Sequence, residues 1–186
     1  GRETDYLLNV NFILIIVVFF ITNTLLFGFA FKYIRKPGVK AFYFPHDNKL
    51  EMIWTVIPAI VLAIIIILGL RSWNNITDEA GKEAINIELF SKQFDWTARY
   101  SGEDNVLGKA NVRYIEGVNT LGVDLADPNA KDDIVVSELH IPKGKKVHFK
   151  LRSQDVLHSA YMPHFRAQMN CVPGMVTNFS FVPTLT

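Results

Sequence analysis

A histidine near the C-terminal end is the residue of this 186-residue chain best suited to metal chemistry. His158 lies in the stretch Ser153–Ser159, directly after an alternating apolar run. Imidazole is a common metal ligand, yet a lone histidine is more often an ordinary polar residue, so both interpretations stay open. The single cysteine, Cys171, cannot form an intramolecular disulfide or a cysteine-rich metal site. We expect it to be a free structural thiol.

Glu51 is an acid placed at the start of a long apolar segment. One interpretation is structural, because the helix dipole favours an acidic side chain near a helix N-terminus. The other is functional, because ionisable groups at membrane depth often belong to proton pathways. Phe94 and Trp96 share one face of an alternating segment, and that pattern alone favours two core residues. Three further histidines lie in polar surroundings and are expected on the surface: His46, His140 and His148.

Two uncharged segments are long enough to cross a membrane. Tyr6–Phe31 has 26 residues, which as a helix measures about 39 Å against a hydrocarbon core of about 30 Å. Met52–Leu70 has 19 residues. The apolar part of the first segment is too long for a signal peptide, and no cleavage pattern follows it. The mean hydropathy of +0.18 agrees with two transmembrane helices, at about 6–31 and 52–70 in a hairpin spanning 1–75.

The loop 32–51 between these helices carries five bases and two acids, a net charge of +3. The positive-inside rule therefore places it in the cytoplasm, or in the matrix of an organelle, with both termini outside. Everything after Arg71 is then an extracytoplasmic domain, which we place in the periplasm of a bacterial inner membrane rather than in a mitochondrion. The overall formal charge of +1 argues against nucleic acid as a partner.

Residues 76–186 have the pattern of short β-strands. Ile85, Ile87 and Leu89 alternate with polar residues, and the segments 94–100 and 147–151 do the same. The pattern predicts a small antiparallel sandwich or barrel. Between the second and third strands lies a long polar segment, residues 101–133, with seven acids and three bases. We call it the acidic excursion.

The whole arrangement resembles subunit II of the haem–copper respiratory oxidases. Glu51–Ala59 is similar to that family's E-x-x-W-T-x-x-P-A segment, and Gln93–Trp96 to its Q-W-x-W region. Val136–Leu139, Ser153–Ser159 and Val172–Gly174 are similar to parts of its cupredoxin-like core. The resemblance covers nearly the whole chain except the acidic excursion. It implies a membrane α-helical hairpin followed by an all-β cupredoxin-like extracytoplasmic domain.

The resemblance implies an electron-entry subunit with a dinuclear copper centre, copper A. The family's ligands are one early histidine and a later C-x-x-x-C-x-x-x-H-x-x-M segment. His158 matches the early histidine, the later segment is expected beyond Thr186, and Cys171 is not one of its cysteines. Bridging thiolates let two coppers share an electron, while imidazole and thioether ligands tune the potential. Haem and copper B belong to partner subunit I, where oxygen is reduced to water and protons are translocated.

The same resemblance assigns roles to three other residues. Trp96 and Phe94 match the aromatic pair at which electrons enter from cytochrome c, although Phe94 stands where the family has tryptophan. Glu51 matches an acid that feeds a proton path in subunit I. The acidic excursion is either a landing surface for a basic cytochrome c or an ordinary solvated loop. The implied partners are subunit I, other oxidase subunits, cytochrome c or a c-type haem domain, the lipid bilayer and a respiratory supercomplex.

Three functions remain open at this point. The first is a cytochrome c oxidase subunit, and the second is a quinol oxidase subunit of the same fold without the copper centre. The third is a membrane-tethered β-domain that binds a partner and has no redox role. His158 favours the first over the second, because the quinol oxidases usually lack a copper ligand there. The match at Glu51–Ala59 argues against the third.

Overall fold

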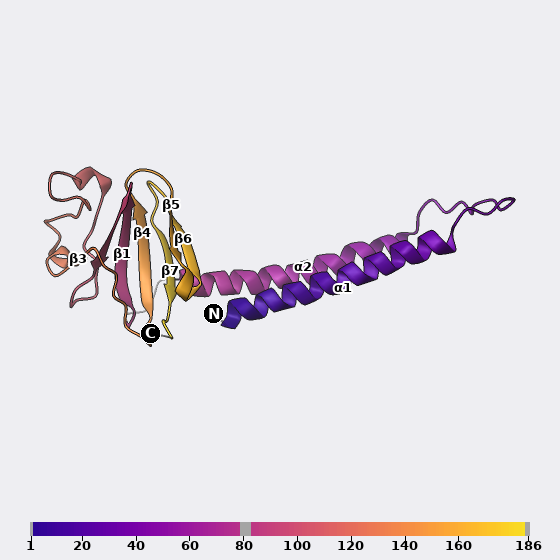
Figure 1. Ribbon diagram of the computed structural model, residues 1–186, viewed down its shortest axis with the longest axis horizontal. Coiled ribbons are helices and arrows are strands. Elements are labelled where there is room, and N and C mark those ends of the chain that lie inside the picture. The colour runs from indigo at the N-terminus through magenta and orange to yellow at the C-terminus, as the bar shows by residue number, and fades with distance from the viewer. Residues whose placement is uncertain (1, 79–82, 185–186) are drawn as a thin grey trace. The chain divides into compact units, whose positions relative to one another are not determined.

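The computed structural model describes residues 2–78 and 83–184. The chain divides into two compact units: the first ends at Trp73, and the second begins at Asn74 (Figure 1). The first unit is a helical hairpin. Helices α1 (Arg2–Lys32) and α2 (Asn48–Thr77) are both long and apolar enough to cross a membrane. Their apolar side chains are exposed along the whole length of the hairpin, as expected of surfaces that face lipid. The two predicted helices are confirmed.

Each helix is longer than its uncharged segment. Glu3 and Asp5 occupy the first turn of α1, where the helix dipole favours acids. At the start of α2, Asp47 is the N-cap, and its Oδ1 accepts the N–H groups of Lys49 and Leu50 at 2.8 and 3.2 Å. Hydropathy therefore indicates which part of each helix lies in the hydrocarbon core of the membrane. Capping and the helix dipole determine where the helix itself begins.

The second unit is an all-β domain made of a five-stranded sheet and a two-stranded ribbon. The sheet has the strand order β3-β2-β1-β4-β7. Its strands are β1 (Ile85–Lys92), β2 (Asp95–Tyr100), β3 (Ile134–Val136), β4 (Val147–Ser153) and β7 (Thr177–Phe181). The ribbon pairs β5 (His158–Met162) with β6 (Ala167–Cys171). The three alternating segments of the sequence correspond to β1, β2 and β4.

The sheet is mixed, so the prediction of a purely antiparallel domain is wrong. β1 runs antiparallel to β2 but parallel to β4, with Ile87 opposite Phe149 and Leu89 opposite Leu151. Alternation tells which face a side chain takes, but it carries no information on the direction of the neighbouring strand. Parallel neighbours need a long connection, and the chain between β1 and β4 supplies one through β2, the acidic excursion and β3.

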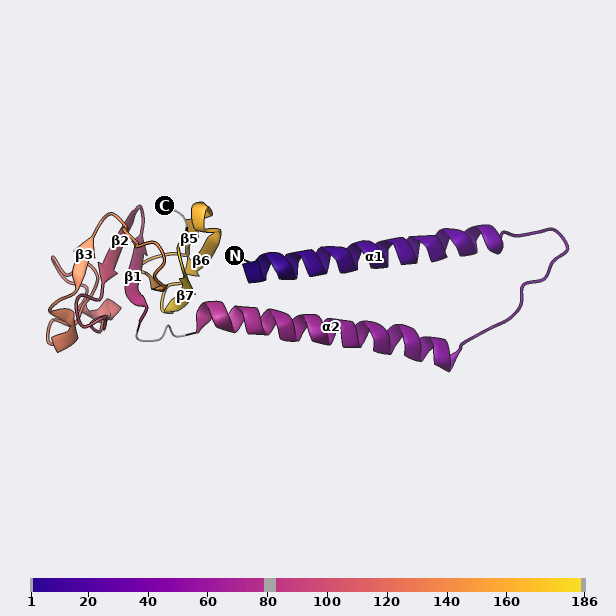
Figure 2. The same cartoon turned by 90° about the horizontal axis from the view of Figure 1, so that it is seen from below.

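The core lies between one face of the sheet and the ribbon. Phe149 of β4 stacks on Phe179 and Phe181 of β7, with ring centroids 5.3 and 5.7 Å apart. Figure 2 shows β5 and β6 beside β7, and the ribbon contributes Ala160 and Cys171 to the buried cluster. The ribbon therefore places the first residue of β5, His158, opposite Cys171 in register.

The acidic excursion covers the other face of the sheet. His148 on this face is buried, and its Nδ1 lies 2.8 Å from the Ser180 Oγ. The prediction that His148 is a surface residue is therefore wrong, whereas His46 and His140 are exposed as predicted. The reason is that excursion residues 105–107 line the same hollow as His148. A side chain on the outer face of a strand is exposed to solvent only where no other segment covers that face of the sheet.

Candidate functional site

His158, the first residue of β5, is held by a carboxylate from the loop before the strand. Its Nε2 lies 2.7 Å from Oδ1 of Asp155, three residues earlier, and its side chain is 15% exposed. The hydrogen bond uses one ring nitrogen and does not involve the other, Nδ1. Metal-bound histidines commonly donate their second ring N–H to a carboxylate, which fixes the tautomer and the ring orientation. His158 is therefore oriented as one metal ligand would be.

Asp155 is itself fixed by the backbone. Its Oδ2 accepts the N–H of Gln93 at 2.7 Å, and its Oδ1 accepts the N–H of Val156 at 2.7 Å. The hydrogen bond with His158 and these two backbone donors lower the pKa of Asp155 to about 2. Asp155 is thus an anion at neutral pH, and it joins the loop before His158 to the turn between β1 and β2.

Phe94 lies in that turn, and Trp96 lies just after it, in β2. The Trp96 ring lies edge-on to the His158 ring, with centroids 5.9 Å apart and planes at 76°. Trp96 is 37% exposed, and Phe94 is 98% exposed. The core interpretation is wrong for Phe94, because Phe94 belongs to the turn and β2 begins only at Asp95. The structure brings Trp96 and His158 together and leaves Phe94 projecting from the surface.

At this place the described residues offer one candidate metal ligand, His158, and not a complete set. Within residues 2–78 and 83–184, there is no group of three or more His, Cys, Asp or Glu side chains that could hold a metal ion. Cys171 pairs with His158 in register, but it is a free, fully buried thiol whose pKa is raised by burial. As predicted from the sequence, Cys171 is a structural residue of the core.

Glu51 lies in the other unit, in the first turn of α2, and is exposed. Its backbone N–H donates to the carbonyl of Asp47 at 2.9 Å. This position agrees with the helix-dipole interpretation and is equally compatible with a proton-collecting carboxylate. The structure leaves both interpretations of Glu51 open.

A buried ion network fastens the acidic excursion to the sheet, and sequence reasoning missed it. Arg99, with a 2% exposed side chain, donates to Glu88 Oε2 at 2.8 Å and to Asp133 Oδ2 at 2.6 Å. Arg152 donates to Glu88 Oε1 at 2.8 Å. Burial raises the pKa of Asp133, and its Oδ1 has no hydrogen-bond partner. Glu88, Arg99 and Arg152 occupy outward-facing positions in the alternation of their strands, and this could have indicated a charged network on that face. Nothing in the local sequence pointed to Asp133.

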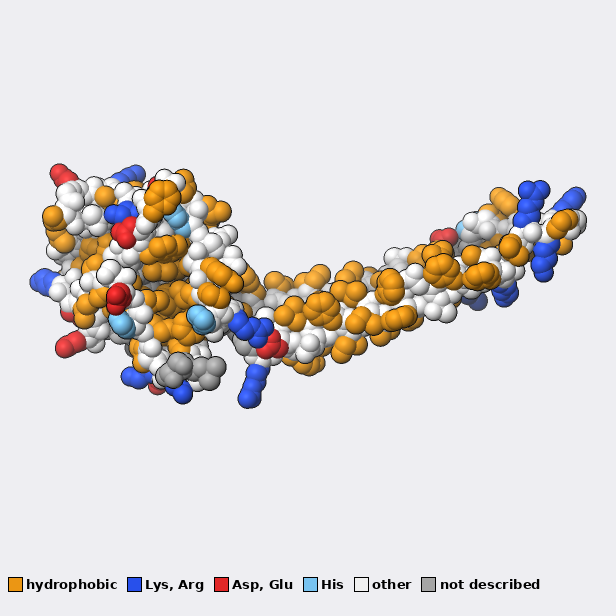
Figure 3. Space-filling view, viewed as in Figure 1, with side chains coloured by type: hydrophobic (Ala, Val, Ile, Leu, Met, Phe, Trp, Pro, Cys, Tyr) orange, Lys and Arg blue, Asp and Glu red, His pale blue; other side chains and the backbone are white. Residues whose placement is uncertain are grey.

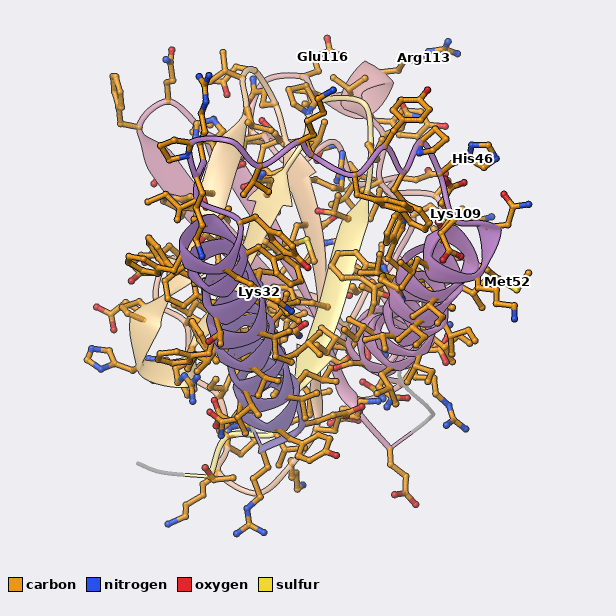
Figure 4. The ribbon with its side chains drawn as sticks, turned by 90° about the vertical axis from the view of Figure 1, so that its right-hand side faces the viewer. Lys32, His46, Met52, Lys109, Arg113 and Glu116 are labelled. Carbon is orange, nitrogen blue, oxygen red and sulfur yellow. The ribbon has the colours of Figure 1, made fainter. Side chains whose placement is uncertain are left out.

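The outer side of the acidic excursion combines charge with apolar side chains. Figure 4 shows Arg113 and Glu116 projecting away from the β-domain. Val118 is fully exposed, and Leu125 is largely exposed. Most acids of the excursion lie at or near the surface: Glu103, Asp104, Glu116, Asp124, Asp127 and Asp132. The excursion therefore presents a largely acidic surface, and the buried ion network attaches it to the sheet.

Known proteins resemble this chain over most of its length. The "Alternative cytochrome c oxidase subunit 2" of Bradyrhizobium diazoefficiens is 38% identical over 159 residues, covering 84% of this chain and 57% of that protein. The "Cytochrome c oxidase subunit 2" of Alkalihalophilus pseudofirmus is 30% identical over 189 residues, covering 96% and 46%. The chain thus spans about half the length of these two relatives.

One solved structure with a similar chain is the periplasmic domain of subunit II of cytochrome oxidase from Bradyrhizobium japonicum. It has 23% identity and a TM-score of 0.36, and the match covers 56% of this chain and 67% of that one.

Two family descriptions match consecutive parts of the chain. "Cytochrome C oxidase subunit II, transmembrane domain" matches residues 2–72, which contain the hairpin. "Cytochrome C oxidase subunit II, periplasmic domain" matches residues 85–185, which contain every strand of the β-domain. Together they cover both units, so this chain belongs to the cytochrome c oxidase subunit II family.

Proposed function

We propose that this chain is the electron-entry subunit of a cytochrome c oxidase. The observation that supports this most is the contact between the Trp96 and His158 rings, 5.9 Å apart, beside a carboxylate that orients His158. A partly exposed indole next to a metal ligand gives an electron a short route from the surface to the metal. Phe94 extends the apolar surface at this point toward a partner.

His158 is one ligand of a dinuclear copper A centre in this proposal. The remaining ligands come from a longer form of the protein, in a C-x-x-x-C-x-x-x-H-x-x-M segment beyond Thr186. Together with His158, that segment would hold the centre, which would supply one-electron transfer when bound. The contribution of the described residues is to hold the imidazole: Asp155 would keep the proton on Nε2, which would leave Nδ1 as the neutral donor for a metal.

The partner that delivers electrons is a basic cytochrome c or c-type haem domain. The acidic excursion has a net charge of −4, and most of its acids lie at or near the surface. Such a surface raises the association rate of a basic partner by electrostatic steering. The Glu88–Arg99–Asp133–Arg152 network supports this role, because it keeps the acids in place relative to the sheet.

The β-domain is periplasmic in this proposal, and the basic loop is cytoplasmic. Glu51, at the cytoplasmic end of α2, collects protons for oxygen reduction in subunit I, where haem and copper B reside. A carboxylate at the start of a membrane helix can bind and release a proton at the water boundary, which fits a proton-path entrance.

The test is copper quantitation and electron paramagnetic resonance on the purified full-length enzyme. The wild type should contain two coppers in the subunit and give a mixed-valence signal. His158→Ala should disturb the signal and block oxidation of cytochrome c while the haems remain intact, and the control His140→Ala, at an exposed histidine, should change neither. A wild-type enzyme without the signal, or one that oxidises quinol directly, would show a quinol oxidase subunit instead.

A further inference from the structure

The loop between the helices exposes a cluster of aromatic side chains. Phe42 and Tyr43 are 87% and 84% exposed, and Phe44 is also exposed. The Phe42 and Phe44 rings are stacked with centroids 6.2 Å apart, so they share one side of the extended segment. Large rings left in water forgo the free energy of burial. The cluster therefore needs a partly apolar environment.

Cations precede this cluster in the chain. Arg35 lies before a turn that the Val39 N–H closes on the carbonyl of Lys36, and Lys40 follows the turn. The Lys32 Nζ lies 5.4 Å from the centre of the Tyr33 ring. Figure 3 shows the Lys and Arg side chains gathered at the loop end of the hairpin, and Figure 4 shows Lys32 at one end of the loop and His46 at the other.

The one acid of the loop proper, Asp47, is already engaged. Its carboxylate caps α2 through the N–H groups of Lys49 and Leu50. The helix dipole therefore partly compensates its negative charge. The remaining loop side chains present positive charge and aromatic rings together, and a binding partner must match both.

A loop that joins two membrane-spanning helices must lie at a bilayer surface. Aromatic rings are favoured at that depth, where one side is apolar and the other is wet. Lysine and arginine near the surface attract anionic headgroups. We propose that residues 32–46 bind anionic phospholipid, with Phe42 and Phe44 inserted at the boundary of headgroups and acyl chains. Arg35, Lys36 and Lys40 contact the phosphates.

The first experiment measures lipid preference. The full chain is reconstituted in nanodiscs of equal phosphatidylglycerol and phosphatidylcholine, and the lipids retained after release are counted by native mass spectrometry. The wild type should retain mainly phosphatidylglycerol. Arg35→Gln with Lys36→Gln should weaken that retention by about fivefold for each charge removed. Lys143→Gln with Lys145→Gln is the matched control, because it removes two exposed charges from the β-domain.

Each outcome is decisive. Equal retention of both lipids by the wild type, or an unchanged preference in the Arg35/Lys36 variant, would overturn the proposal. An equal loss in the control variant would reveal a general charge effect and would overturn it as well. Inorganic phosphate should displace no more lipid than chloride at the same ionic strength. Stronger displacement by phosphate would mean a site for the free anion.

The second experiment measures depth. A spin label at Phe44→Cys should be more accessible to dissolved oxygen than to a water-soluble nickel chelate, because the side chain lies among lipid. A label at Lys143→Cys should show the reverse. Cys171 is fully buried, and the unmodified chain treated identically measures any background labelling. A Phe44 label with the accessibility of the Lys143 label would contradict insertion.

Discussion

Asp155 Oδ1 and His158 Nε2 lie 2.7 Å apart, and the same carboxylate accepts the backbone N–H of Gln93. One side chain thus joins the turn that bears Phe94 to the residue proposed as a copper ligand. The relationship explains how Trp96 and His158 come to lie side by side although they belong to the sheet and the ribbon.

Asp155→Ala should weaken copper binding to the full-length subunit by about 10- to 100-fold, because the imidazole loses the partner that sets its tautomer. Competition with a copper chelator measures the affinity. Asp155→Asn, which keeps an acceptor oxygen, should retain more affinity than alanine. Asp95→Ala removes another exposed carboxylate from the same region and is the control. Equal affinity in wild type and Asp155→Ala would remove Asp155 from the site.

Arg99→Met should destabilise the β-domain by about 3–5 kcal/mol, because it leaves Asp133 buried without its cation and Glu88 with Arg152 alone. Denaturant unfolding followed by tryptophan fluorescence gives the free energy. Arg113→Met, at an exposed position of the same excursion, should change it by less than about 0.5 kcal/mol. Similar losses in both variants would mean that the network does not stabilise the domain.

Asp132 should make the stability of the acidic excursion depend on pH. Backbone N–H groups of Asp104 and Glu103 donate to its Oδ2 and lower its pKa below the ordinary value of 3.8. A lowered pKa means a stabilisation that is complete above pH 3.8 and is lost as pH falls through the folded-state pKa. The melting temperatures of wild type and Asp132→Asn should therefore differ at pH 7 and converge below pH 3.8. A constant difference would contradict this assignment.

Removing acids from the excursion should slow the reaction with a basic cytochrome c. Glu103→Gln with Glu116→Gln should lower kcat/KM at low ionic strength and flatten its dependence on salt, because steering is electrostatic. Lys131→Gln, which makes the same surface more acidic, should raise kcat/KM. The same response in both variants would argue that the excursion is an ordinary solvated loop.

Glu51→Gln should slow steady-state oxygen reduction severalfold without changing copper content, because an amide cannot carry a proton at the entrance of a path. Asp47→Asn, which keeps a capping oxygen for α2, should leave turnover unchanged. Turnover of Glu51→Gln equal to wild type over a range of pH would restore the purely structural interpretation.

The alternation of apolar residues was enough to locate β1, β2 and β4, because side-chain phase is a local property. Strand direction and coverage are not local. Ile87 and Phe149 are neighbours in a parallel pair that no short pattern announces, and His148 is buried by a segment that precedes it by about forty residues. Asp133 was likewise invisible, since its partner Arg99 lies 34 residues away.

The candidate site was predictable to the extent that its residues lie within one motif. His158 was predicted from the stretch Ser153–Ser159. The role of Asp155 was not, because it depends on the turn that brings its carboxylate against the ring of His158, three residues later. The position of Phe94 was not predictable from spacing, because the strand begins one residue later than the alternation suggests.

The parallel pairing of β1 with β4 also bears on how the chain is made. Glu88 and Arg152, which meet across this pair, are 64 residues apart. At a synthesis rate of about 5–20 residues per second, β1 waits roughly 3–13 s for its neighbour. During that time Ile87 and Leu89 have only β2 beside them, and the core face is still bare, because the ribbon of β5 and β6 follows β4 in the chain. The domain completes its core only after β4, the ribbon and β7 have all been made.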